Sequence, residues 1–339
     1  MRLSVIVPAR NEADVLRPCL ESLLAQSEPG FAIAEDWELL LVDDGSTDAT
    51  RSIALDLAHV TVLDPEPLNP GWTGKANAVW TAAGKSKGDW LLFTDADTIH
   101  TPGNLQRAMH EAQHAGVAML SYSPRQVATG FWQRALMPLI FSELALTYPP
   151  DKVSDPSSRV AAANGQFLMV ERAAYFKVGG HAAVAGSLLE DVDLAVLLKR
   201  RKFPIRFRYA PEALSARMYR SFGAMMQGWT KNLARLFPSP LMMAVWRALD
   251  LPLLVGVPLL IWYFFPVFLV RYGLALIWLR VLWRFYSRVA KSNFSALDCA
   301  LSVFALPLFC LLLARSWWQH TVRGEVAWKD RAYPTTKAG

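Results

Sequence analysis

Two aspartates one residue apart follow a short apolar run in the first third of the chain. Residues 90–93, Trp-Leu-Leu-Phe, predict a buried strand, and Asp95 and Asp97 come directly after it. Because alternate side chains of an extended segment point the same way, both carboxylates can face one pocket. Their hard oxygen atoms suit a divalent cation, which in turn can hold a diphosphate. A lone Asp-x-Asp is also common in solvated turns, so the surrounding residues must decide between the two interpretations.

Acidic residues occur at two further places where the predicted elements change. Asp43 and Asp44 directly follow the apolar strand predicted over residues 38–42 and precede a glycine turn. A strand, a turn and a capped helix would not by themselves require two adjacent carboxylates there. Glu190 and Asp191 open a predicted helix, where acidic side chains also suit the helix macrodipole without any catalytic role.

A glycine-containing segment, Pro70–Ala78, opens another predicted helix. Glycines let a ligand approach the backbone closely, and Lys75 at the helix start can neutralise phosphate together with the free amide groups there. The spacing Gly-x-x-x-x-Gly-Lys-Ser/Thr is absent, since only Gly71 and Gly74 precede the lysine and an alanine follows it, which argues against an ATPase. His181 is assigned no role, because a single histidine is more often a packed or surface residue than a ligand.

The elements that must position these residues alternate between strands and helices. Strands are predicted at the N-terminus up to Val7 and over residues 38–42, 60–63, 90–93, 117–121, 167–170, 205–209 and 213–216. Helices are predicted over residues 13–25, from about 49, after 75, over 102–114, up to about 200 and over 221–236. This alternation predicts an α/β fold with a mostly parallel sheet, whose ligand site lies at the carboxyl ends of the strands.

The composition divides the chain into a globular part and an apolar part. Of 339 residues 53% are hydrophobic, and beyond about Phe237 long apolar runs are flanked by basic residues. We expect a catalytic domain over 1–236, membrane helices over 237–317 and a basic tail over 318–339. Leu251–Val270 and Cys299–Ala314 are the two clear candidate spans. Leu274–Trp283, which Arg280 interrupts, is a third, so the number of spans stays open.

The charge and the cysteines favour a membrane partner and a reducing compartment. The net charge is +6, but the basic residues gather beside apolar runs and lack the base-stacking pattern of a nucleic-acid binder, so lipid headgroups explain them better. The cysteines, Cys19, Cys299 and Cys310, have no metal-ligand spacing and suggest reduced thiols. We therefore expect a multi-pass protein of the cell membrane with a cytoplasmic catalytic domain. The apolar segment Phe131–Tyr148 is either an interfacial helix or a buried core helix.

Taken together and in this order, the motifs resemble the family 2 glycosyltransferases of the GT-A fold. The residues that carry the resemblance are residues 4–12 (SVIVPARNE), 42–48 (VDDGSTD), 74–78 (GKANA), 94–97 (TDAD) and 189–191 (LED). The resemblance covers Arg2 to about Leu236. It implies a Rossmann-like nucleotide-diphospho-sugar transferase domain followed here by C-terminal transmembrane helices.

The resemblance also implies roles for individual residues. Pro8, Glu12, Asp43 and Asp44 would hold the nucleotide of the sugar donor, a UDP-sugar by our expectation, together with Lys75 and Asp95. Asp95 and Asp97 would hold Mg²⁺ or Mn²⁺ on its diphosphate. Asp191 would be the general base, and Glu190 or Asp193 could take that part instead. Attack from the far face of the sugar would invert the anomeric configuration and turn an α-linked donor into a β-glycoside.

The last helix before the apolar runs is similar to the branch that glycosylates membrane lipids, including carotenoid and hopanoid-associated transferases. Gln227, Trp229 and Lys231 lie in it and would meet the acceptor, although Trp229 could instead belong to an interfacial aromatic belt and Lys231 be a surface charge. Processive synthases carry Gln-x-x-Arg-Trp, which is absent. We therefore expect one transfer of a hexose such as glucose to a lipid hydroxyl. A polyprenyl-phosphate acceptor and a non-catalytic nucleotide-binding scaffold on the membrane are the alternatives.

Overall fold

The chain folds into two compact units, each built from two segments. A computed structural model describes all residues except 27, 266, 329–330 and 335–339. The first unit comprises Met1–Val127 and Tyr148–Met218, and the second comprises Ala128–Thr147 and Tyr219–Gly339. These units do not follow the boundary expected at residue 236, because residues 128–147 and 219–236 group with the C-terminal helices. The functional division into a catalytic and a membrane part stays a prediction.

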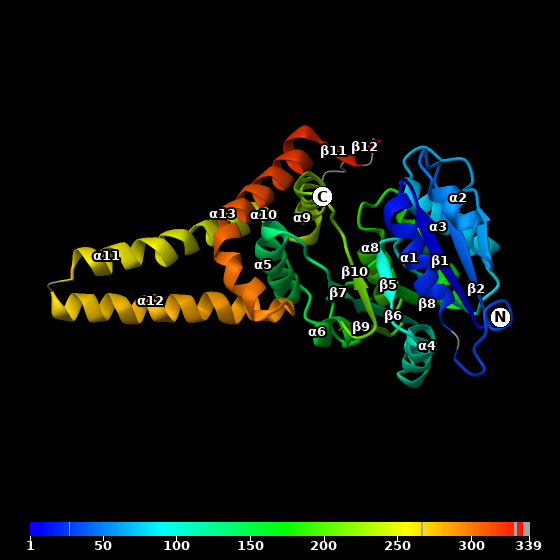
Figure 1. Ribbon diagram of the computed structural model, residues 1–339, viewed down its shortest axis with the longest axis horizontal. Coiled ribbons are helices and arrows are strands. Elements are labelled where there is room, and N and C mark those ends of the chain that lie inside the picture. The colour runs from blue at the N-terminus through cyan, green and yellow to red at the C-terminus, as the bar shows by residue number, and fades with distance from the viewer. Residues whose placement is uncertain (27, 266, 329–330, 335–339) are drawn as a thin grey trace. The chain divides into compact units, whose positions relative to one another are not determined.

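A seven-stranded sheet in the order β3-β2-β1-β4-β8-β6-β9 forms the centre of the first unit (Figure 1). Its strands are β1 (Leu3–Ala9), β2 (Trp37–Asp43), β3 (Val60–Leu63), β4 (Trp90–Phe93), β6 (Met119–Ser123), β8 (Leu168–Glu171) and β9 (Ile205–Tyr209). Only β8 runs antiparallel to its neighbours, which confirms the expected GT-A-type α/β sheet. A separate sheet contains β5 (Thr98–His100), β10 (Leu214–Ala216) and β7 (Arg125–Gln126), so the strand predicted over 213–216 lies outside the main sheet.

Apolar cores cover both faces of this sheet, because successive side chains of each strand point to opposite faces. Val5 and Val7 belong to one core, while Ile6 belongs to the other. The first core packs against α1 (Ala13–Leu24) and α4 (Asn104–His114), and the second against α3 (Gly74–Lys85), α7 (Arg172–Lys177) and α8 (Glu190–Arg200). The remaining helices of this unit are α2 (Thr50–Leu55), α6 (Pro150–Ser154) and the short 3₁₀ helix η1 (Gly180–Val184). Burial of the sheet on both faces explains why its strands are almost continuously apolar.

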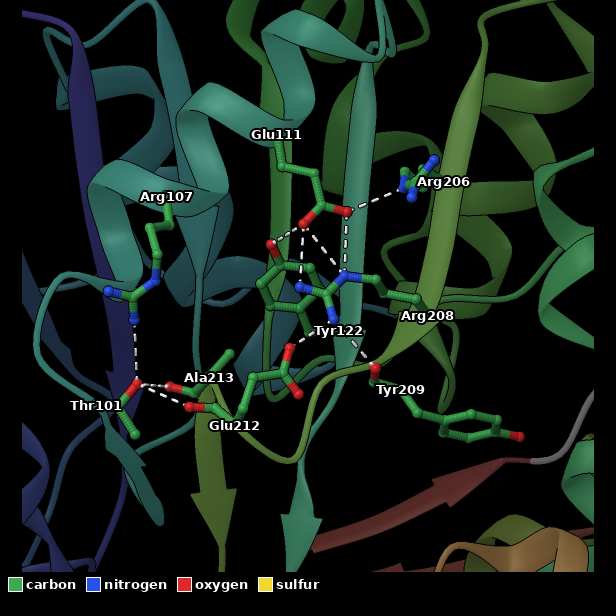
Figure 2. Close-up of polar contacts among 9 residues, drawn as sticks. All are labelled: Thr101, Arg107, Glu111, Tyr122, Arg206, Arg208, Tyr209, Glu212 and Ala213. Atoms are coloured by element: carbon green, nitrogen blue, oxygen red, sulfur yellow. Dashed lines mark hydrogen bonds and ion pairs between the residues drawn. The ribbon is translucent and has the colours of Figure 1, made fainter.

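The edge strand β9 is held against α4 by the carboxylate of Glu111 (Figure 2). Glu111 of α4 accepts hydrogen bonds from Arg206 and Arg208 of β9 at 2.9 and 3.0 Å, and from the phenol of Tyr122 at 2.7 Å. The guanidinium of Arg208 also lies over the Tyr122 ring, 4.5 Å from its centroid, and pairs with Glu212. Charged side chains on an edge strand discourage pairing with another chain, so this cluster closes the sheet at β9.

The second unit is helical apart from one short hairpin. Its elements are α5 (Phe131–Thr147), α9 (Phe222–Leu236), α10 (Pro240–Ala248), the π-helical turn η2 (Pro252–Gly256), α11 (Val257–Tyr263), α12 (Phe268–Val289), η3 (Ala290–Ser292), α13 (Ala296–Trp318), η4 (Gln319–Arg323), β11 (Glu325–Trp328) and β12 (Arg331–Pro334). Nearly every residue of α5 between Gln133 and Glu143 is buried within this unit. Of the two interpretations of Phe131–Tyr148, the buried core helix is therefore the one that fits.

Among the described residues, two helices are long and apolar enough to cross a membrane, Pro240–Tyr263 and Ala296–Arg323. The uncharged run 251–270 is not a single helix, as the first predicted span would require. Its first part continues α10 and ends at Tyr263, and α12 begins only at Phe268. Hydropathy alone could not distinguish one helix from two helices joined by a turn, because both are apolar.

Buried charges join three helices of the second unit. Glu143 of α5 pairs with Arg247 of α10 at 2.9 Å and with Arg288 of α12 at 3.4 Å. Asp250, directly after α10, pairs with the same two arginines at 3.2 and 2.9 Å and with Arg284 at 3.0 Å. Because buried charges persist only when they are paired, Arg284 and Arg288, two of the basic residues of α12, are held by acidic partners inside this unit.

Candidate active site

The predicted site residues of the first unit meet where its strands end. Pro8 lies near the end of β1, Asp43 is the last residue of β2, and Asp95 and Asp97 follow β4. β1 pairs with both β2 and β4 in parallel, so these ends lie side by side. This is the carboxyl edge of an open α/β sheet, where such folds bind ligands.

Lys75 connects the Asp-x-Asp segment to the start of α8. Its Nζ lies 2.8 Å from Oδ1 of Asp95 and 2.9 Å from Oε1 of Glu190. Burial opposes the charge of this lysine, but the carboxylates of Asp95, Glu190 and Asp191 outweigh that effect and raise its pKa well above the usual range. Lys75 therefore supplies a fixed positive charge next to the acidic residues, as phosphate binding would need.

Asp191 is held in a defined orientation by backbone N–H groups. Its Oδ2 accepts a hydrogen bond from the amide of Gly165 at 2.7 Å, and its Oδ1 accepts one from the amide of Val192 at 2.8 Å. Removal from water, to which the charge of Glu190 adds, raises the pKa of Asp191 to about 6. Asp193, also in the first turn of α8, instead accepts a hydrogen bond from Ser187 Oγ at 2.6 Å, so its carboxylate is engaged with the segment that precedes the helix. A half-buried carboxylate with a raised pKa is suited to accepting a proton near neutral pH.

Asp97 has an oxygen that suits a cation. Its Oδ1 is sealed from solvent and has no hydrogen-bond partner in the described part of the chain. Burial, to which the negative charges of Asp95 and Glu12 add, raises the pKa of Asp97 to about 7. Among the described residues, no group of three or more His, Cys, Asp or Glu side chains is arranged to hold a metal by itself. Mg²⁺ is commonly held by one or two carboxylates together with substrate phosphates, so Asp95 and Asp97 fit a cation that a bound diphosphate completes.

The loops after β1 and β2 are tied together by hydrogen bonds. Thr47 donates its amide to the side-chain oxygen of Asn11 at 2.8 Å, and Asn11 donates its amide to Ser46 Oγ at 3.0 Å. Asp43 accepts the amide of Ser46 at 3.1 Å, and Asp44 pairs with Arg10 at 3.8 Å.

Glu12 belongs to the same loop region, through its amide, which donates to Thr50 Oγ1 at 2.8 Å. Its charge also reaches Asp97, whose pKa it helps to raise. The structure thus brings the predicted nucleotide-binding residues of these two loops to one edge of the sheet.

One pocket collects most of these residues. It is lined by side chains and backbone from five predicted site residues and six others: Pro8, Lys75, Val79, Phe93, Thr94, Asp95, Gly165, Leu168, His181, Glu190 and Asp191. Two of the lining residues, His181 and Gly165, were not predicted from the sequence to belong to the site. A Cβ atom at Gly165 would lie 3.1 Å from Lys75 Nζ, so only glycine fits here without displacing the lysine. For His181 the available signal was the pair of glycines that precedes it.

The three predicted acceptor residues lie on α9 in the second unit. Gln227 is exposed and Lys231 is half-buried. Trp229 is only 2% exposed and packs edge-on against Phe141 and Tyr219, so it belongs to the core of this unit. A role of these residues in acceptor binding stays a proposal.

Comparison with known proteins agrees with this geometry. Residues 4–170 match the family described as "Glycosyl transferase family 2". Among curated proteins the chain is similar to 4,4'-diaponeurosporenoate glycosyltransferase of Staphylococcus aureus (strain USA300), with 23% identity over 99% of this chain and 89% of that protein. The same enzyme of Staphylococcus haemolyticus is 27% identical over 68% of this chain, and the alignment spans 61% of that protein's length.

Among solved structures the fold resembles a mannosyltransferase from Pyrobaculum calidifontis in complex with GDP-Man and Mn²⁺. The TM-score is 0.56 at 19% identity, over 95% of this chain and 87% of the other. Residues 4–170 therefore form a domain of glycosyl transferase family 2, and the fold of this domain is GT-A.

Proposed function

We propose that this protein is an inverting, metal-dependent hexosyltransferase that moves a sugar from a UDP-sugar to a hydroxyl of a membrane lipid. The observation that carries the proposal is the single pocket that holds Lys75, Asp95 and Asp191 together. A cationic group for the leaving diphosphate and a carboxylate for the attacking hydroxyl are the two requirements of direct sugar transfer.

On the donor side, negative charge builds up on the departing nucleoside diphosphate. Lys75 can exchange its contacts with Asp95 and Glu190 for phosphate oxygens, because its charge persists while its partners are flexible side chains. A divalent cation held by Asp95 and Asp97 would supply Lewis-acid stabilisation of the same phosphates. The loop residues Asp43 and Asp44 stand at the neighbouring strand end, where they would receive the nucleoside.

On the acceptor side, the hydroxyl must lose its proton as it bonds to the anomeric carbon. Asp191 would take that proton, since its carboxylate is oriented by the amides of Gly165 and Val192 and its pKa is raised toward neutrality. One carboxylate and direct attack from the far face give inversion: the bond from acceptor oxygen to anomeric carbon forms as the bond to phosphate breaks.

The second unit supports a lipid acceptor and a multi-pass location in the cell membrane. Large apolar side chains stand exposed on α11 and α12, among them Trp262 at 78%, Leu269 at 82% and Trp283 at 72%. Contiguous exposed apolar surface of this kind is typical of membrane contact. The similar staphylococcal enzymes are named for a carotenoid acid, an apolar acceptor, and the alignment with one of them includes the C-terminal helices. We place the first unit on the cytoplasmic side, where nucleotide sugars would reach it.

A transfer assay with membranes tests this function. Full-length protein in membrane vesicles is supplied with radiolabelled nucleotide sugars, UDP-glucose first, and the organic extract is analysed for label, with Asp191→Asn as the matched control. Label in an alkali-stable neutral lipid supports a hydroxyl acceptor. Label in an acid-labile polyprenyl phosphate would replace this acceptor with the alternative one. No label from any nucleotide sugar in the wild-type protein would refute the transferase proposal.

A further inference from the structure

His181 has one ring nitrogen engaged and the other free, although its side chain is almost fully buried. It is 3% exposed, and Tyr175 Oη lies 2.8 Å from its Nδ1. The same phenol oxygen accepts a hydrogen bond from the backbone amide of His181 at 3.1 Å. In the part of the chain that the structure describes, the phenol proton of Tyr175 has no acceptor other than Nδ1. Because an unpaired buried hydroxyl proton is costly, Nδ1 is the acceptor and the ring proton resides on Nε2.

The protonated Nε2 has no protein partner among the described residues, yet His181 lines the pocket of Lys75, Glu190 and Asp191. Such an N–H, facing a pocket, bonds to the water or the ligand that the pocket holds. The nitrogen is therefore available to whatever occupies this pocket.

The backbone before His181 fixes where the ring lies. Gly179 and Gly180 have φ values of +88° and +52°, in the left-handed region that favours glycine. A Cβ at Gly180 would lie 2.5 Å from the ring of Tyr175, so a larger residue would displace the group that orients His181. The edge of the imidazole also packs against Phe93, with centroids 4.7 Å apart. Phe93 ends β4, so the ring is held against the strand that leads to Asp95.

The imidazole is uncharged. Burial lowers its pKa to about 4, the negative charge of Glu190 opposes this effect, and Lys75 adds to it. A neutral N–H supplies no charge to an ionised phosphate, whereas Lys75 in the same pocket does. A hydroxyl group suits the pair, because it can accept a hydrogen bond from the imidazole and donate one to the carboxylate.

We propose that Nε2–H of His181 donates a hydrogen bond to a hydroxyl oxygen of the donor's sugar, so that this residue selects among nucleotide sugars. The proposal rests on the proposed function and adds a specificity-determining residue to it. Tyr175 is a positioning residue, since it acts by holding the tautomer and orientation of His181. A sugar that lacks the hydroxyl would leave the buried N–H unpaired, which is how polar pockets reject deoxy analogues.

The test compares wild type with His181→Phe, using UDP-glucose and its monodeoxy analogues. In wild type one analogue should lose at least about tenfold in kcat/KM relative to UDP-glucose, and in His181→Phe that difference should disappear. Calorimetric affinity for UDP in Mn²⁺ should be the same in both proteins, because UDP has no sugar to contact His181. Tyr175→Phe should reduce the same difference in kcat/KM between UDP-glucose and the deoxy analogue, and it should leave the affinity for UDP unchanged. It is the second variant to use if His181→Phe unfolds at a lower temperature than wild type.

Three results would overturn the proposal. One is that each deoxy analogue loses the same factor in kcat/KM, relative to UDP-glucose, in wild type and in the variants. Another is a fall in UDP affinity in His181→Phe that matches the fall in kcat/KM, since this would place the contact on the diphosphate. The third is an equal calorimetric affinity of wild type and His181→Phe for UDP-glucose. This measurement does not require that either protein transfers the sugar. Transfer by wild type accompanied by any of these refutes the role of His181 and leaves the transferase function standing.

Discussion

The pH dependence of sugar transfer follows from the environment of Asp191. Its carboxyl has a pKa of about 6 instead of the ordinary 3.8, because burial and the neighbouring charge of Glu190 disfavour the ionised form. A general base acts only when deprotonated, so turnover should be constant above this pH and fall about tenfold per pH unit well below it. At about pH 5 we expect a loss of about tenfold. A base with the ordinary pKa would lose less than about a tenth of its activity at that pH.

Two variants should shift the acidic limb of the pH–rate profile, the range below the pKa in which turnover falls, in opposite directions. Glu190→Gln removes a negative charge that raises the pKa of Asp191, so the limb should shift to lower pH. Lys75→Met removes a positive charge that lowers this pKa, so its limb should shift to higher pH. The measurement is kcat at saturating donor between about pH 4.5 and 8, at constant ionic strength because salt screens such effects.

Asp191→Asn should retain donor affinity and lose about 10²–10⁴-fold in turnover, the usual contribution of a general base. A profile that stays flat down to about pH 5, or limbs of the two variants that move the same way, would refute the assignment of Asp191 as the base. A flat profile is also what an already ionised phosphate acceptor would produce, so the experiment separates the two acceptor classes.

Three further predictions concern the cation, the glycine behind Lys75 and the edge of the sheet. Asp97→Asn should make donor binding insensitive to Mn²⁺ in calorimetry and lower turnover by orders of magnitude, whereas full wild-type turnover in excess chelator would contradict the cation site. Gly165→Ala should cut kcat/KM at least about tenfold, because its Cβ would crowd Lys75 and Asp191, while Gly84→Ala, with nothing within 4 Å, should change it little. Glu111→Gln should lower the free energy of unfolding by about 1–3 kcal/mol in thermal melting, and more than Glu212→Gln, whose side chain is 62% exposed; equal effects would show that the cluster in Figure 2 does not stabilise the edge.

The local sequence determined the order of the elements and the chemistry available at the site. Apolar runs of about four to five residues that are followed by Asp43 or Asp95 predict strands whose polar ends meet at one edge of a sheet. The helix start at Lys75 and the acidic start of α8 were likewise visible, because caps, glycines and charges act on neighbouring residues. For these reasons the α/β fold and the acidic residues of the first unit were predicted from the sequence.

Only the tertiary structure decided which of these residues touch. The pairing of Lys75 with both Asp95 and Glu190 and the amide of Gly165 on Asp191 join segments whose approach depends on packing of the whole sheet. The division of the apolar run 251–270 and the burial of Trp229 were hidden for the same reason. A side chain's type and spacing state what it can bind, but its pKa and its hydrogen-bond partners depend on neighbours that only the folded chain brings together.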